Sequence, residues 1–125
     1  MQSLIKRLGI KPDMRVCVMG FNDENFFTGL EELPVELKIG GPQKDTDLIF
    51  LRIHDKEGLY ALHALVTFLK PSGAIWILWD KGWKSLNESH IREAVIEDGL
   101  VDEKIERFSF RLSAMKLVFP VDDRA

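Results

Sequence analysis

Three apolar runs of the sequence are each followed by side chains that could bind a ligand or transfer a proton. The runs cover residues 15–20, 46–53 and 73–79. A histidine beside an aspartate could act as an acid–base pair, and glycine lets the backbone approach a bound molecule closely. The candidate ligand-binding residues at these places are Gly20, Phe21, Asn22 and Asp23, then His54 and Asp55, then Asp80, Lys81 and Trp83.

The same residues also have a purely structural interpretation. Asn22, Asp23 and Asp55 each precede a segment that could be a helix. Short polar side chains at such positions cap helices by accepting hydrogen bonds from the first free backbone N–H groups. His54 would then be an ordinary loop residue. The sequence alone leaves both interpretations open.

Other kinds of chemistry have less support. Side chains of adjacent residues in an extended segment point to opposite sides, which separates His54 from Asp55. Ser85 and Ser89 do not lie in the glycine-rich turn of a nucleophile elbow. The histidines at positions 54, 63 and 90 do not have the spacing of metal ligands. We therefore assign no catalytic residue and expect no metal site.

The elements that must position these residues follow from the apolar pattern. Residues 73–79 are uncharged, and this predicts a strand that is buried on both faces. Trp76 and Trp79 are three residues apart in it, so they should face opposite sides. The apolar stretch 48–51 predicts a second buried strand over residues 46–53, and the spacing of apolar residues over Lys56–Lys70 predicts a helix between the two. Strand, helix and strand in this order are typical of a parallel α/β sheet.

Further strands are predicted over residues 15–20, 35–39, 100–108 and 112–119. The last two are joined by too few residues for a crossover helix, so they must pair antiparallel. Right-handed crossovers then give a three-layer, Rossmann-like α/β fold with a mostly parallel sheet of order 2-1-3-4-6-5 and a C-terminal antiparallel hairpin. We expect one domain over residues 1–120 and a frayed tail over 121–125. Ligands bind such sheets beyond the carboxyl ends of strands 1 and 3, where the order reverses.

The composition argues against several classes of function. The 125 residues carry 17 basic and 20 acidic side chains, interspersed, for a formal net charge of −3. Nucleic-acid binding needs a basic face, so we expect no nucleic-acid partner. The N-terminal residues lack the apolar core of a signal peptide, and we expect no membrane association. The one cysteine, Cys17, lies in an apolar run, which predicts a buried, unreactive thiol and agrees with a reducing, cytoplasmic location.

Several segments resemble known families. Residues 46–50 (TDLIF), residues 69–77 (LKPSGAIWI) and the final hairpin resemble the later half of class I S-adenosylmethionine (SAM)-dependent methyltransferases. Residues 4–119 as a whole are similar to a family of small bacterial proteins of unknown function with a Rossmann-like fold. That similarity rests on residues 8–16 (LGIKPDMRV) and 99–105 (GLVDEKI) as well. The resemblance implies the fold and does not by itself define an activity.

The chain departs from the methyltransferase pattern where those enzymes hold their cofactor. They have a Gly-x-Gly turn after the first strand and an acid after the second, whereas this chain has Gly20-Phe21 and Lys38-Ile-Gly40. It is also shorter by one βα unit. We therefore expect a degenerate site without a cofactor, and we favour a non-catalytic binding or protein-interaction module. The alternatives are a small-molecule-binding protein and a SAM-dependent methyltransferase, both using the crevice beyond strands 1 and 3.

Trp83 is the residue for which the sequence most suggests an interaction role. It follows the buried strand between Gly82 and Lys84, where no apolar alternation requires an aromatic ring. An exposed aromatic side chain beside lysines suits an acidic or amphipathic protein partner. The alternative is that the ring folds back over the edge of the sheet and covers the core.

Overall fold

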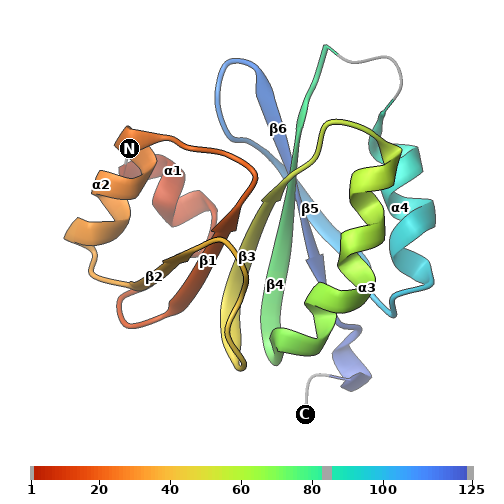
Figure 1. Cartoon of the computed structure of the whole chain (residues 1–125), viewed down its shortest axis with the longest axis horizontal. Coiled ribbons are helices and arrows are strands. Elements are labelled where there is room, and N and C mark those ends of the chain that lie inside the picture. Colours follow the sequence, from red (N-terminus) through yellow and green to blue (C-terminus); the bar gives the residue numbers. More distant parts are fainter. Residues whose placement is uncertain (1, 83–85, 124–125) are drawn as a thin grey trace.

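A computed structural model describes residues 2–82 and 86–123 of the chain. Helices lie on both faces of a single six-stranded sheet (Figure 1). The elements in chain order are α1 (Gln2–Arg7), β1 (Arg15–Met19), α2 (Glu24–Glu32), β2 (Glu36–Ile39), β3 (Thr46–Arg52), the 3₁₀ helix η1 (Lys56–Ala61), α3 (Leu62–Leu65), the 3₁₀ helix η2 (Val66–Phe68), β4 (Leu69–Asp80), α4 (Glu88–Ile96), β5 (Val101–Arg107), β6 (Leu112–Val118) and η3 (Val121–Asp123).

The strands pair in the order β2-β1-β3-β4-β6-β5, which confirms the predicted topology and fold class. β2, β1, β3 and β4 are parallel to one another, and β6 pairs antiparallel with both β4 and β5. The chain reverses its direction of travel across the sheet between β1 and β3. The carboxyl ends of these two strands are therefore the place where an open α/β sheet ordinarily binds its ligand.

Each face of the sheet has its own apolar core. Trp76 of β4 packs into the core that lies against α1 and α2, whereas Trp79 of the same strand packs into the core against α3 and α4. Their exposed fractions are 0% and 4%. The prediction that these two side chains face opposite sides is confirmed, and both of them are core residues.

The segment 56–70 differs from the single α-helix that its apolar spacing predicts. Only α3 is α-helical, η1 and η2 on either side of it are 3₁₀ helices, and β4 already begins at Leu69. The buried leucines Leu59, Leu62 and Leu65 are three residues apart, which matches the three-residue turn of a 3₁₀ helix. In the part of the chain that the structure describes, no helix is long and apolar enough to cross a membrane.

A loop of six residues, 40–45, connects β2 to β3 and crosses β1 (Figure 1). Ile39 is level with Val18, which pairs with Phe50, four residues beyond Thr46. The loop must therefore cross two strand spacings and return along about 13 Å of strand, a path of roughly 20 Å over β1. The seven Cα–Cα steps from Ile39 to Thr46 span at most about 24 Å. A helix, which rises only about 1.5 Å per residue, could not make this connection.

Two side chains of β1 hold the 40–45 loop in place. The Cys17 thiol donates a hydrogen bond to the Gly40 carbonyl oxygen over 3.0 Å, and Arg15 Nη1 donates one to the Lys44 carbonyl oxygen over 2.7 Å. Burial raises the pKa of the Cys17 thiol to about 11, so the thiol keeps its proton at neutral pH. Cys17 is 1% exposed, which confirms the prediction of a buried thiol.

The central strands should dominate stability. Ile75 of β4 is completely buried, so we expect Ile75→Ala to lower the free energy of unfolding by about 2–5 kcal/mol through lost apolar contacts and a residual cavity. Ile96, which is 72% exposed on α4, provides a matched control. Ile96→Ala should change the free energy of unfolding by no more than about 0.5 kcal/mol. Urea unfolding monitored by circular dichroism measures both, and a loss below about 1 kcal/mol at Ile75 would contradict the central position of β4.

Candidate functional site

The carboxyl ends of β1, β3 and β4 place the predicted site residues at one edge of the sheet (Figure 1). Residues 20–23 follow β1, residues 54–55 follow β3, and Asp80 ends β4 with Lys81 directly after it. Trp83, the remaining predicted site residue, lies outside the described residues. The fold thus groups these segments along one edge, and their individual contacts indicate what each side chain does there.

Two carboxylates of this edge cap helices. Asp23 Oδ1 accepts a hydrogen bond from the backbone N–H of Phe26 over 3.0 Å, at the start of α2. Asp55 Oδ1 accepts one from the backbone N–H of Gly58 over 3.0 Å, at the start of η1. Their neighbours Asn22 and His54 have exposed side chains. The structural interpretation of Asp23 and Asp55 as caps therefore matches their contacts.

Gly20 allows β1 to approach β3 closely. Its backbone angle φ is +87°, which residues with a Cβ atom rarely adopt. A Cβ built on it would lie 2.7 Å from the carbonyl oxygen of Arg52, the last residue of β3. The space that a glycine leaves open at the end of the first strand is therefore taken up by the backbone of the neighbouring strand.

Phe21 belongs to a cluster of aromatic rings. Its ring centroid lies 5.6 Å from that of Phe108, 6.1 Å from that of Phe26 and 6.5 Å from that of Phe27. Phe108 follows β5 at the start of the hairpin turn. β1 and β5 are four strand spacings apart, about 19 Å, so the contact between Phe21 and Phe108 bridges this edge of the sheet on the side of α2. The loop after β1 is held by these contacts.

Asp80 has its side-chain oxygens occupied by protein donors. Asp80 is 7% exposed, and it accepts hydrogen bonds from the backbone N–H of Gly82 over 2.9 Å and from Arg111 Nη2 over 3.1 Å. The Gly82 hydrogen bond lowers the pKa of Asp80 from its ordinary value of 3.8, burial opposes this, and the charge of Arg111 lowers the pKa further. Asp80 is therefore ionised at neutral pH and is not suited to act as a general acid.

The structure adds Phe110, which sequence reasoning missed. Phe110 lies in the turn between β5 and β6 and is 79% exposed. Lys81 Nζ lies 5.7 Å from its ring centroid, and the guanidinium carbon of Arg107 lies 5.8 Å from it. Arg111, next in sequence, has a side chain that is 78% exposed. We call Lys81, Arg107, Phe110 and Arg111 the cationic lip.

The edge does not fit SAM in the way that the resemblance implies. The glycine space after β1 faces the Arg52 carbonyl oxygen, and Phe21 packs against other rings. At the end of β2, where an acid would bind the ribose hydroxyls, the chain has Lys38, Ile39 and Gly40. The contacts described for Gly20, Phe21, Asp23 and Asp55 are thus those of packing and capping.

Fold and edge together define a Rossmann-like chain whose first glycine turn is packed against its own sheet. No protein-family model and no curated protein matches the sequence. Among solved structures, the chain is similar to a SAM-dependent methyltransferase from Aquifex aeolicus, with a TM-score of 0.72 and 13% identity over 93% of this chain and 87% of that one. It is also similar to a magnesium protoporphyrin IX methyltransferase from Synechocystis with bound SAH, with a TM-score of 0.62 and 8% identity over 94% and 80% of the two chains. At such identities the likeness shows the fold alone.

A pair of glycine substitutions tests the packing of the first turn. Gly9 and Gly20 both have positive φ, +75° and +87°, but a Cβ on Gly9 would meet no atom within 4 Å. Gly9→Ala should therefore cost only the backbone strain, about 1–2 kcal/mol of unfolding free energy. Gly20→Ala should cost about 1–3 kcal/mol more because its Cβ would overlap the Arg52 carbonyl oxygen. Equal losses for the two variants in urea unfolding would show that β1 and β3 are not in close contact there.

Proposed function

We propose that this chain is a non-catalytic binding module on a methyltransferase-like fold, and that it binds an acidic protein segment at the cationic lip. The observation that carries the proposal is the exposure of Phe110 between two cations. A ring that is 79% exposed gains apolar burial only through a partner. The cations beside it would orient a partner that carries carboxylates.

The charges of the lip favour an acidic partner. Lys81 and Arg107 place two positive charges beside the Phe110 ring, and Arg111, the next residue, is paired with Asp80 and has a side chain that is 78% exposed. Aromatic and arginine side chains are the residue types that most often dominate the energy of protein interfaces. Complementary charge at the rim of such an interface mainly raises the rate of association and the specificity.

The contacts at the edge of the sheet support a binding role over catalysis. The space beside Gly20 is filled by the Arg52 carbonyl oxygen, and Asp23 and Asp55 cap helices. The likeness to solved methyltransferases favours the second candidate, a SAM-dependent methyltransferase or a small-molecule-binding protein that uses the crevice beyond β1 and β3. The two candidates differ in what they predict for SAM itself.

SAM should not bind at physiological concentrations. Titration of SAM into the protein should give no binding isotherm by calorimetry. The Arg52 carbonyl oxygen fills the space beside Gly20, and the end of β2 has no carboxylate to bind the ribose hydroxyls. A dissociation constant in the low micromolar range would overturn the proposal and favour the methyltransferase alternative. Nitrogen-15 NMR spectra of the same samples report whether the amides of residues 20–23 shift on addition of SAM.

Phe110→Ala should weaken binding strongly without affecting the fold. The probe is a fluorescein-labelled peptide of glutamates around a central leucine, read by fluorescence anisotropy. We expect Phe110→Ala to weaken binding about thirtyfold, the effect of an interface hot spot of about 2 kcal/mol. The free energy of unfolding should change by no more than about 0.5 kcal/mol, because the ring is exposed.

Two further variants complete the experiment on the cationic lip. Lys81→Glu should weaken binding of the peptide and reduce its dependence on salt, because it replaces an attraction by a repulsion. Ile39→Ala, at a side chain that is 62% exposed on β2, is the control and should bind as the unmodified protein does. Unchanged affinity in Phe110→Ala, or no binding of the peptide to the unmodified protein, would contradict this assignment of the lip.

A further inference from the structure

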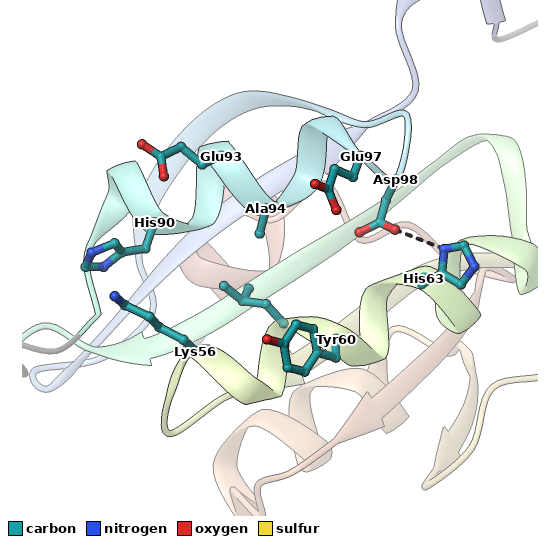
Figure 2. A pocket seen from close by; sticks show the side chains of 9 residues that line it. Lys56, Tyr60, His63, His90, Glu93, Ala94, Glu97 and Asp98 are labelled. Atoms are coloured by element: carbon teal, nitrogen blue, oxygen red, sulfur yellow. Dashed lines mark ion pairs between the residues drawn. The ribbon is translucent and has the colours of Figure 1, made fainter.

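A groove with a volume of about 550 Å³ lies between η1 and α3 on one side and α4 on the other (Figure 2). Its lining includes the buried Leu59 and the half-buried Ala94, and Tyr60 on its border is 81% exposed. Sites for small molecules have volumes of roughly 300–1,000 Å³ and combine an apolar lining with a few polar groups. The groove is formed by other elements than the cationic lip and does not depend on the function proposed for the lip.

The two ends of the groove differ in charge. Lys56, His90 and Glu93 lie at one end, and Glu97, Asp98 and His63 lie at the other, with Tyr60 between them (Figure 2). The dipole of α4 has the same sense, because His90 is in the first turn of this nine-residue helix and Glu97 caps its carboxyl end. The Glu97–Asp98 end therefore attracts a cation, whereas at the other end Lys56 and the amino end of α4 offer contacts to an anion beside the carboxylate of Glu93.

The hydrogen bonds of the two histidines fit this polarity. His90 Nδ1 accepts a hydrogen bond from the backbone N–H of Asn87 over 3.1 Å, so the hydrogen of the neutral ring is on Nε2. That nitrogen can donate to an anion. At the other end, His63 Nδ1 lies 3.4 Å from Asp98 Oδ1, and this contact leaves the second carboxylate oxygen of Asp98 able to accept.

Lys56 and Glu97 are exposed charged side chains whose hydrogen-bonding groups are free to contact a ligand in the groove. Arg92, also on α4, pairs with Glu88 over 3.5 Å and with Asp102 over 3.1 Å. Within the described ranges 2–82 and 86–123, the side chains of Lys56 and Glu97 form no ion pair and no hydrogen bond. Opposite charges on a ligand would supply the missing partners at both ends.

We propose that the groove binds a short peptide with free termini, its carboxylate against Lys56 and His90 and its ammonium group against Glu97 and Asp98. His90 and Glu97 are seven residues apart on one helix, which corresponds to about 10 Å. An extended peptide advances about 3.3–3.6 Å per residue, so about three residues span this distance. Apolar side chains of the peptide would contact Leu59 and Tyr60.

The tripeptide Ala-Leu-Ala with free termini is the probe, titrated into nitrogen-15-labelled protein and followed by NMR. We expect the amides of residues 56–63 and 90–98 to shift in a saturable way at concentrations up to about 10 mM, where weak binding is still measurable. Acetylation of the peptide amino group and amidation of its carboxyl group should each weaken binding at least about fivefold, because each removes one charge contact.

Variants assign each terminus to its end of the groove. Glu97→Gln should weaken binding of the free peptide but have no further effect on binding of the acetylated one. Lys56→Gln should weaken binding of the free peptide but have no further effect on binding of the amidated one. Glu31→Gln and Lys44→Gln, at exposed side chains on the rest of the surface, are matched controls and should bind as the unmodified protein does. Absence of amide shifts, shifts confined to other residues, or tighter binding of a simple diamine such as putrescine would overturn the proposal.

Discussion

Contacts among aromatic rings hold the carboxyl edge of the sheet together on the side of α1 and α2. Phe26 of α2 packs edge-on against Phe50 of β3, at 5.4 Å between ring centroids, and against Phe108, at 5.1 Å, while Phe50 stacks on Trp76 of β4 at 6.3 Å. Such pairs stabilise a fold by about 0.5–1.5 kcal/mol each beyond the burial of their area. Because Phe21 packs on the same rings, moving the loop after β1 would disturb the core.

The packing beyond β1 and β3 leads us to propose binding at two other places, the cationic lip beyond β4 and the groove beside α4. The fold is one that many proteins use to hold a ligand at the switch point, but a fold does not determine a function. The proposed surfaces contain the exposed Phe110 and the charged residues between α3 and α4. Both surfaces lie outside the aromatic core, so changes there can alter binding at little cost in stability.

The strand order could be predicted because two apolar stretches, 48–51 and 73–79, and one short hairpin connection leave few possible topologies. For Asp23 and Asp55 the sequence could give only two alternatives, because a carboxylate before a helix has the same pattern whether it caps or binds. The exposure of Phe110 could not be predicted, because it depends on how the turn after β5 leaves the sheet and not on periodicity. The groove could not be predicted either, since it depends on how closely two helices pack.

The 40–45 loop also limits how this sheet can vary in length. Removal of two residues would shorten the reach of the connection to about 17 Å, which is less than the path over β1 and would force β2 to slip or to leave the sheet. Added residues cost only loop-closure entropy, about 0.6 kcal/mol for each doubling of the loop. Insertions and deletions at this connection therefore have unequal consequences. The maximum length of the extended backbone therefore limits how far this loop can be shortened, but it does not limit how far the loop can be lengthened.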